Sequence, residues 1–359
     1  MSQNTNLNNA NKTKNDEFYT RYDDIEKEMN CYYEYNKEVF KDKTILLPCD
    51  DPEWSNFTKY FLANFSRFGL KKIISTSYAK SAGNKTITEI ERKSPNFDEE
   101  KNKTHGKLFI FDRSKITSTR VNYEDIDFTY LDGDGDFHSD EVKKLRDEAD
   151  IIITNPPFSL FREFVDWIME GKKKFIIIGS QNAITYKEFF PLLKDNKAWL
   201  GCNPVKEFLT PDGGTQKFGN ICWYTNVDHG KRHKEKDLMT MSENLKFNKK
   251  LQKKLAEYGI TFYPKYDDYN ALEVPFNKAI PSDYNDVMGV PITFLDEYCP
   301  EQFEIVGLDR YVKDNPHYGR RFTINGKETY ARILIKKKEV KDNEWFLWWK
   351  QCPLRIYKE

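Results

Sequence analysis

Short apolar runs alternate with amphipathic segments over about the first 200 residues of the chain. Runs such as Ile151–Ile153 and Phe175–Ile178 are continuous, which is typical of strands covered on both faces of a sheet. The segments between such runs place apolar residues at helical spacing. Strands are predicted in 43–52, 71–78, 106–112, 151–154, 173–180 and 197–202, and helices in 16–40, 54–68, 139–148, 159–171 and 184–196. Alternating strands and helices predict an α/β unit with a parallel sheet.

The pattern changes after about residue 200. Short aromatic runs and polar loops such as PDGGTQKFGN and HGKRHKEKD predict a largely irregular or β region over 201–338. The first 15 residues are polar and Asn-rich, so we predict a flexible arm followed by an α/β core over 16–200. A C-terminal tail is predicted at 339–359, with no assigned role.

Charge divides unevenly along a chain whose net charge is zero. Residues 1–170 hold 25 Lys and Arg against 32 Asp and Glu, a balance of −7, and the remainder carries +7. The later part could face a polyanion, although ordinary solvated charge is the simpler interpretation. No apolar run is long enough for a membrane span, and the polar N-terminus has no signal-peptide core. We therefore predict a cytoplasmic protein.

The six cysteines show no metal-binding spacing. None lies in a C-x-x-C pair, and no His follows them at zinc-finger spacing. We predict mostly reduced thiols and no metal site. The cysteines are Cys31, Cys49, Cys202, Cys222, Cys299 and Cys352.

The tetrapeptide Asn155-Pro156-Pro157-Phe158 directly follows a predicted buried strand. Each proline fixes φ and lacks an N–H, and each residue before a proline is kept out of the helical region. The resulting stiff turn offers an Asn oxygen and a backbone carbonyl as acceptors for an NH2 group. Phe158 adds a flat face for a planar ring. The alternative is a plain strand-to-helix turn with Ser159 as N-cap.

Two acidic turns could serve a second ligand. Cys49-Asp50-Asp51-Pro52 ends the first predicted strand, and Asp132–Phe137, DGDGDF, precedes the strand before the Asn-Pro-Pro-Phe turn. Carboxylates at strand ends can accept hydrogen bonds from ribose hydroxyls or amino groups. DGDGDF also resembles a calcium loop, but the glutamate that ends an EF-hand loop is missing.

Taken together, the motifs resemble the EcoRI-type adenine-specific DNA methyltransferases of type II restriction–modification systems. The matching segments run in order from about residue 16 to 338. They are DEFYTRYDDIEKE, CDDPEWSNFTKYFLANF, DGDGDFHSDE, IIITNPPFSLF, ITYKE with AWLG, YPKYDDYNALEV, IPSDYNDVMGVPITFL, PEQFE and YARILIK. The resemblance implies a Rossmann-like core at 16–200 and a target-recognition, DNA-binding region at 201–338. The implied activity is methyl transfer from S-adenosylmethionine to N6 of a flipped adenine in duplex DNA, with GAATTC as the suggested sequence.

The resemblance also implies roles for residues. Asn155, Pro156, Pro157 and Phe158 would form the catalytic clamp. The cofactor would be bound by Phe18, Tyr19, Thr20, Asp50, Asp51, Pro52, Asp134, Gly135, Asp136 and Phe137. Basic and amide side chains of the 203–237 region could read bases or contact phosphates. These candidates are Asn203, Lys206, Gln216, Asn220, Lys231, Arg232 and Lys234.

Three other activities stay open at this point. A methyltransferase acting on protein glutamine uses a similar clamp, and an RNA adenine methyltransferase would also need one. A DNA-binding protein without catalysis is the rival from a different class. The resemblance further implies a cognate restriction endonuclease in the same system. We also expect no membrane partner, and a monomer, because an enzyme that modifies one strand at a time needs no two-fold symmetry.

Overall fold

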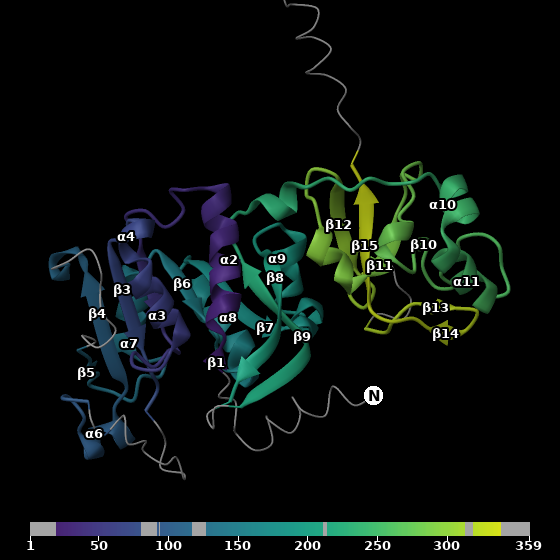
Figure 1. Ribbon diagram of the computed structural model, residues 1–359. Helices are drawn as coiled ribbons and strands as arrows, with labels where there is room; N and C mark the ends of the chain where they lie inside the picture. Colours follow the sequence, from purple (N-terminus) through teal and green to yellow (C-terminus); the bar gives the residue numbers. More distant parts are fainter. Residues whose placement is uncertain are drawn as a thin grey trace, which may run out of the picture. The chain divides into compact units, whose positions relative to one another are not determined.

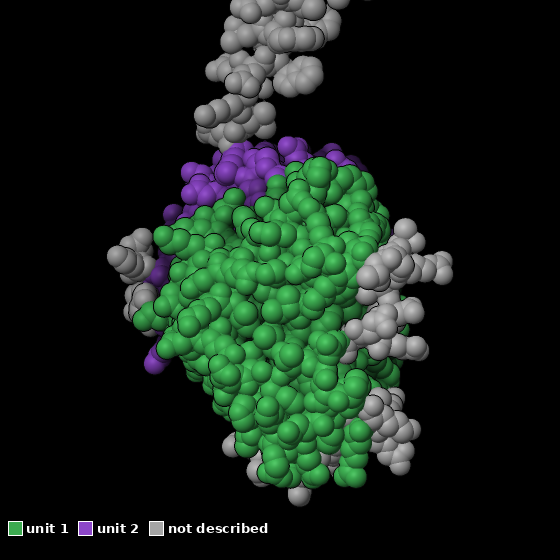
Figure 2. Space-filling model, turned by 90° about the vertical axis from the view of Figure 1, so that its left-hand side faces the viewer, with its two compact units in different colours: residues 1–231 green, residues 232–359 purple. Residues whose placement is uncertain are grey.

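The computed structural model describes residues 19–79, 92, 94–116, 127–210, 214–312 and 319–338. The chain divides into two compact units, Met1–Lys231 and Arg232–Glu359, which Figure 2 distinguishes by colour. The predicted boundary between residues 200 and 201 falls inside a strand, Trp199–Leu209, so the first unit extends further than the sequence pattern indicated.

A nine-stranded mixed sheet forms the first unit, in the order β1-β8-β9-β7-β6-β2-β3-β4-β5 (Figure 1). Four neighbouring strands, β3, β2, β6 and β7, are parallel, whereas β9 and β4 run antiparallel to the strands beside them. The strands are β1 (Tyr19–Thr20), β2 (Thr44–Leu47), β3 (Lys72–Thr76), β4 (Lys107–Asp112), β5 (Thr129–Tyr130), β6 (Ile151–Thr154), β7 (Lys174–Ser180), β8 (Trp199–Leu209) and β9 (Thr215–Thr225). The α/β class predicted from the sequence is thus observed, but the sheet is mixed, whereas a parallel sheet was predicted.

Helices cover both faces of this sheet. Residues of α2, α3 and α4 share one core with Ile45, Ile151 and Ile176 of the central strands. Side chains alternate along a strand, so Gly179 of β7 faces the other side, where it contacts Phe161 of α8. The helices are α2 (Tyr22–Tyr35), α3 (Asn56–Ala63), α4 (Phe65–Phe68), α6 (Glu99–Thr104), α7 (Asp140–Glu148), α8 (Phe161–Glu170) and α9 (Phe190–Lys194), with 3-10 turns at Arg113–Lys115, Phe158–Leu160, Gln181–Thr185 and Gly230–His233.

Local capping explains where several helices begin and end. The hydroxyl of Ser55 accepts from Phe57 N at the start of α3, and Ser139 accepts from Val142 N at the start of α7. The predicted helix 54–68 divides into α3 and α4 and ends at Gly69, whose φ of 62° is left-handed. The predicted helix 184–196 is shorter, because it resolves into a 3-10 turn and α9. Helix α6 was not predicted.

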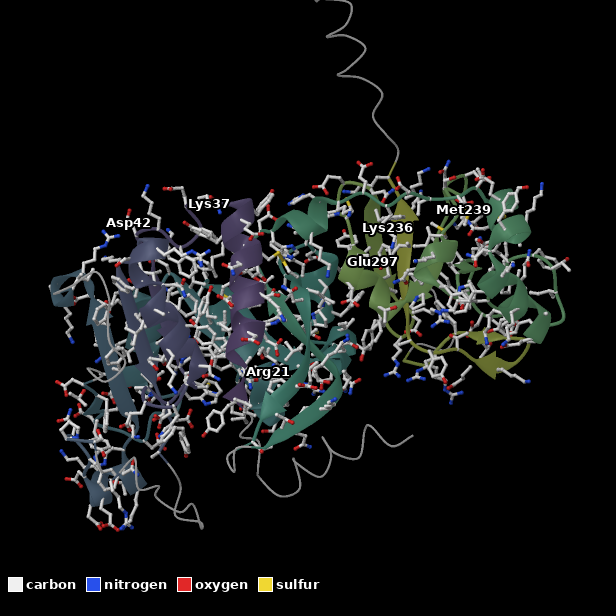
Figure 3. The ribbon with its side chains drawn as sticks, in the orientation of Figure 1. Arg21, Lys37, Asp42, Lys236, Met239 and Glu297 are labelled. Carbon is white, nitrogen blue, oxygen red and sulfur yellow. A yellow bond between two sulfur atoms is a disulfide. The ribbon has the colours of Figure 1, made fainter. Side chains whose placement is uncertain are left out.

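The second unit contains a four-stranded sheet, in the order β10-β11-β15-β12, and a short hairpin. Lys236 and Glu297 form an ion pair within this unit, and both are labelled in Figure 3.

The helices and strands of the second unit are α10 (Met241–Phe247), α11 (Lys249–Glu257), β10 (Leu272–Glu273), β11 (Met288–Pro291), β12 (Phe303–Leu308), β13 (Thr323–Ile324), β14 (Lys327–Glu328) and β15 (Arg332–Lys337), with 3-10 turns at Asn277–Ala279 and Ile292–Glu297.

The cysteines depart in part from the expectation of reduced thiols. Cys31 of α2 and Cys202 of β8 form a disulfide, although 171 positions separate them. Cys49, Cys222 and Cys299 are not in disulfides, and Cys352 lies outside the described residues, as do the predicted arm and tail. Among the helices of the described residues, none has the length and apolar character needed to cross a membrane.

Candidate functional site

The order of the parallel strands places the site. The chain passes from β2 to β3 on one side, and later returns to β6 on the other side of β2. Ligands of open α/β sheets bind outside the carboxyl ends of strands at such a change of direction. The turn after β2 contains Asp50 and Asp51, and the turn after β6 begins with Asn155. Two of the segments singled out by the sequence therefore meet at one edge.

Asp50 joins these two turns through buried hydrogen bonds. Its Oδ2 accepts from the hydroxyl of Thr154 at 2.6 Å, and its Oδ1 accepts from the hydroxyl of Ser55 at 2.6 Å. The carbonyl of Asp50 accepts from Ser75 at 2.6 Å. Burial raises the pKa of the Asp50 carboxyl to about 7, although the two hydroxyls oppose the shift. Both oxygens of the Asp50 side chain therefore bind groups inside the protein.

The Asn-Pro-Pro-Phe turn leaves the sheet in an extended conformation. Pro157 has φ −55° and ψ 124°, and a 3-10 turn starts at Phe158. Pro156 is buried, and Asn155 and Phe158 are half-buried. The ring of Phe158 meets Phe208 of β8 edge-on, with centroids 6.3 Å apart. Helix α8 begins at Phe161 with Leu160 as its N-cap, so the Ser159 cap of the alternative interpretation is not observed.

A buried lysine organises the acidic turn after β2. Lys107, at the start of β4, is 2% exposed. Its Nζ lies 3.3 Å from a carboxylate oxygen of Asp51 and 2.6 Å from one of Glu53, and it sits 4.9 Å from the ring centroid of Phe128. The acidic side chains are mostly shielded, which strengthens their attraction to the lysine. Pro52, next to Asp51, is buried in this turn.

The short strand β1 approaches the same turn. Thr20 pairs with Phe208 of β8, and its carbonyl accepts from the side chain of Asn56 at 2.8 Å. Asn56 begins α3 directly after the Asp50 turn. Tyr19 and Thr20 are thus brought to the carboxyl edge of the sheet, whereas Phe18 lies outside the described residues.

The DGDGDF turn closes over the end of β3. The carbonyl of Asp134 accepts from Ala79 N at 2.6 Å, and Gly135 adopts a φ of 84°. A Cβ at Gly135 would lie 2.3 Å from the carbonyl oxygen of Ser77, so only glycine fits there. Burial raises the pKa of the Cys49 thiol, and the charge of Asp50, with a smaller effect from Asp136, raises it further.

Phe137 of the same turn faces away from solvent. It is 6% exposed and packs edge-on against Phe164, with ring centroids 5.2 Å apart, and against Trp167 at 5.7 Å. Its present contacts are therefore with α8, and they anchor the turn to the helix that follows the Asn-Pro-Pro-Phe segment.

Comparison with known proteins identifies the family. The family model described as adenine-specific methyltransferase EcoRI matches residues 6–338. The type II methyltransferase M.EcoRI of Escherichia coli is 40% identical over 352 residues, which cover 93% of this chain and 97% of that protein. The chain belongs to this family. The adenine-specific DNA methyltransferase predicted from the sequence is confirmed at the level of the family.

Two further relatives come from mycoplasmas. A type II methyltransferase of Mycoplasma genitalium is 34% identical over 366 residues, covering 93% of this chain and 99% of its own length. The type II methyltransferase M.MpnI of Mycoplasma pneumoniae is 30% identical over 365 residues, covering 93% and 98%. No solved structure matches this chain.

In this EcoRI-family chain, the candidate base readers fall into two groups. Lys206, Gln216 and Asn220 lie on the β8–β9 hairpin, towards the edge at which β7 ends, because Ser180 pairs with Ile221. Lys206 is exposed, whereas Asn220 donates to the Ser180 hydroxyl at 3.4 Å. The hairpin therefore extends along the same edge as the clamp.

The other candidates have structural contacts or lie elsewhere. The amide of Asn203 donates to buried Glu28 at 3.0 Å, and Lys231 donates to the carbonyl of Cys202 at 2.8 Å. Arg232 is 8% exposed. Lys231, Arg232 and Lys234 follow the end of β9, whose last residue, Thr225, pairs with Ile176 near the start of β7. Lys231 is exposed but belongs to the first unit, and Arg232 is buried in the second. Lys234 belongs to the second unit and its side chain is exposed.

Sequence reasoning missed the side chains that hold the candidate site together. Ser55, Ser75 and Thr154 supply the hydroxyls around Asp50, and Lys107 forms ion pairs with Asp51 and Glu53. The sequence offered one weak indication of two of these residues. Ser75 and Thr154 stand at or beside the last residues of buried strands, where an apolar residue would otherwise be expected.

Proposed function

We propose that this chain transfers a methyl group from S-adenosylmethionine to N6 of an adenine flipped out of duplex DNA. The observation that carries the proposal is the position of Asn155-Pro156-Pro157-Phe158. The segment leaves β6 at the point where the strand order reverses, and Thr154 ties it to the turn after β2. We further propose that the first unit is a Rossmann-like methyltransferase core acting in the cytoplasm.

The cofactor site would lie at the carboxyl ends of β2 and β3. S-adenosylmethionine supplies an electrophilic methyl group on a cationic sulfonium, together with an amino group and ribose hydroxyls. The charged groups of these turns fit such a molecule, because Asp51, Glu53, Asp134 and Asp136 supply carboxylates, and Lys107 pairs with the first two of them. The site would also be lined by Tyr19, Thr20, Pro52 and Gly135. Phe137 would hold the DGDGDF turn in place by packing against α8.

The role proposed for Asp50 differs from the role that the resemblance implied. The Asp50 side chain is 7% exposed, and each of its oxygens already accepts a hydrogen bond from inside the protein, one from Ser55 and one from Thr154. We propose instead that Asp50 positions the clamp by holding the last residue of β6.

The clamp residues would act on the target amine. Oδ1 of Asn155 and the carbonyl of Pro156 would accept the two N6–H groups of adenine. The acceptors would favour a pyramidal nitrogen whose lone pair can attack, and would stabilise the positive charge that develops on it. Phe158 would stack on the flipped base, a contact of about 1–3 kcal/mol for a base on an aromatic ring. Base flipping is needed because N6 is enclosed in the duplex.

We propose that the β8–β9 hairpin and the second unit recognise DNA. Lys206, Gln216 and Asn220 extend along the clamp edge and are the leading candidates in the first unit. The family resemblance suggests GAATTC as the sequence, with a cognate endonuclease that the methylation would block. A monomer suffices, because each strand of the site is modified separately.

Single-molecule sequencing tests this proposal. The chain would be expressed in a host free of adenine methylation, and the DNA read for N6-methyladenine. The expected result is a signal at one short motif, GAATTC. The matched variant Asn155→Ala should abolish the signal while purified protein still binds duplex DNA. Modification at a different motif would retain the chemistry and overturn the proposed specificity.

Two results would contradict the proposed chemistry. Full activity of Asn155→Ala would show that the clamp assignment is wrong. The absence of modified adenine with folded protein in ample cofactor would favour RNA, protein glutamine or a binder without catalysis. Assays on RNA and on glutamine peptides with radiolabelled cofactor would separate these outcomes.

A further inference from the structure

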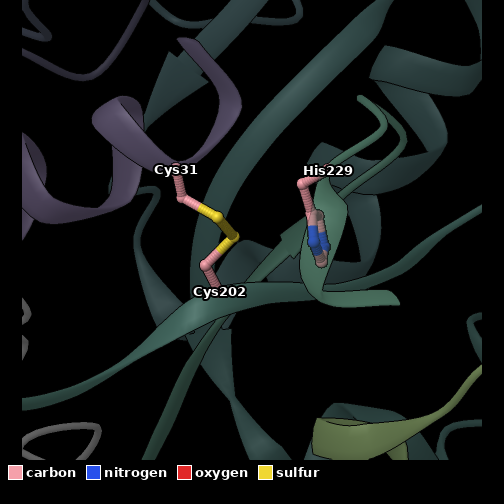
Figure 4. A group of neighbouring side chains, drawn as sticks. All are labelled: Cys31, Cys202 and His229. Carbon is pink, nitrogen blue, oxygen red and sulfur yellow. A yellow bond between two sulfur atoms is a disulfide. The ribbon is translucent and has the colours of Figure 1, made fainter. Parts of the chain in front are cut away.

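Three side chains capable of binding a metal meet on the first unit, outside the proposed methyltransferase site. Cys31 comes from α2, Cys202 from β8 and His229 from the segment after β9 (Figure 4). One ligand atom from each lies within 4.8 Å of the others. The two cysteines are joined as a disulfide, with Cα atoms 6.5 Å apart. The three residues come from separate segments of the chain, so they do not form a short sequence motif.

The hydrogen bonding of His229 suits a metal ligand. The ring is 2% exposed, and its Nε2 lies 2.9 Å from the carbonyl oxygen of Leu200. A carbonyl can only accept, so the proton of the neutral ring resides on Nε2 and Nδ1 carries the lone pair. Metal-bound histidines commonly donate their other N–H to a carbonyl in this way. Tyr32 holds the ring edge-on, with centroids 5.5 Å apart.

The sulfur atoms can be reached from solvent. Cys31 and Cys202 are half-buried and line a cavity of about 570 Å³. Glu34 lines the same cavity, and its carboxylate or a water molecule would be the fourth ligand. Two thiolates, one imidazole and one oxygen ligand form a set that zinc accepts in tetrahedral geometry.

We propose that Cys31, Cys202 and His229 bind a zinc-class divalent cation when the disulfide between the two cysteines is reduced. Reduction consumes two molecules of a thiol, which supply two electrons and two protons and leave as their own disulfide. Metal binding then releases the protons of both cysteine thiols. The disulfide and the metal-bound pair are alternative states, and either one fastens α2 to β8.

Cobalt titration of the full-length, untagged chain tests the site. In protein reduced with a phosphine, one equivalent of Co²⁺ should produce thiolate-to-cobalt charge-transfer bands, and Zn²⁺ should remove them stoichiometrically. The oxidised protein should show no bands. Cys31→Ser and Cys202→Ser should lose the bands, and His229→Gln should weaken binding at least tenfold. Cys299→Ser, which changes a buried thiol of the second unit, is the control and should bind normally.

Alkylation provides a readout that requires no substitution. Zinc should protect two cysteines of the reduced wild-type chain from alkylation, and peptide mass analysis should identify them as Cys31 and Cys202. Protection of other cysteines, or none, would overturn the proposal even if the serine variants fail to fold. Equal cobalt binding by the oxidised and reduced chains would do the same.

Discussion

The carboxylate of Asp50 accepts a 2.6 Å hydrogen bond from the hydroxyl of Thr154, the residue directly before Asn155. The bond spans two parallel strands, since Asp50 follows β2 and Thr154 ends β6. Ser55 occupies the other carboxylate oxygen. We infer that the position of the proposed clamp depends on this interior carboxylate, and this dependence can be tested without substituting the clamp residues themselves.

Thr154→Val removes the hydroxyl and keeps the shape of the side chain. One oxygen of Asp50 then loses its donor, which typically costs about 1–3 kcal/mol in a buried site. Because Asn155 is the next residue, we expect kcat for methylation to fall about tenfold, corresponding to about 1.4 kcal/mol of transition-state stabilisation. Steady-state methylation and urea unfolding measure the two effects.

Thr225→Val is the matched control for this change. Thr225 is equally buried and donates to the carbonyl of Phe175 at 2.7 Å, at the opposite edge of the sheet. It should lower the free energy of unfolding but leave kcat near the wild-type value. Equal losses of kcat in the two variants would show that Thr154 acts through general stability alone.

Protonation of Asp50 should make stability depend on pH. Burial raises its pKa from an ordinary 3.8 to about 7, so between these values the folded chain holds a proton that the unfolded chain has released. The stabilising contribution is complete below pH 3.8 and is lost as the pH rises towards 7. Each unit of pKa difference corresponds to about 1.4 kcal/mol. Asp50→Asn lacks this contribution.

The measurement is urea unfolding of the wild type and Asp50→Asn at a series of pH values from 4.5 to 8. The wild type should lose stability relative to the variant as the pH rises to about 7, and the difference should then become constant. Parallel curves over the whole range would show that Asp50 has an ordinary pKa in the folded chain.

Local patterns predicted much of this fold, and non-local contacts account for the remainder. The runs at 151–154 and 173–180 form β6 and β7. A continuous apolar run can be identified as a strand from the local sequence, without knowledge of the strands that pair with it. The β8–β9 pairing and the disulfide between Cys31 and Cys202 depend on contacts between distant segments. The proposed clamp could be found in the sequence because it is one short segment. The hydroxyls that bind Asp50 come from β3, β6 and the start of α3, which are brought together only in the folded chain.

Gly135→Ala should displace the DGDGDF turn. An alanine at a φ of 84° costs about 1–2 kcal/mol in a left-handed conformation. Its Cβ would also lie 2.3 Å from the Ser77 carbonyl oxygen, which adds an overpacking cost of about 1–3 kcal/mol. We expect weaker cofactor binding, measured by calorimetry, together with lower stability. Gly69→Ala, with a φ of 62° and a nearest contact of 3.6 Å, should show only the smaller conformational cost and normal cofactor affinity.

Lys206 provides a test of the DNA-binding edge. It is exposed on β8, on the hairpin that runs along the clamp edge, so Lys206→Ala should weaken DNA binding. Loss of one phosphate contact lowers the slope of log K against log salt by about 1 and affects all sequences alike, whereas loss of a base contact changes the preferred motif. Lys71→Ala is the control, because this exposed lysine precedes β3 at the opposite edge. Identical salt slopes and the same preferred motif for the two variants would remove Lys206 from the DNA interface.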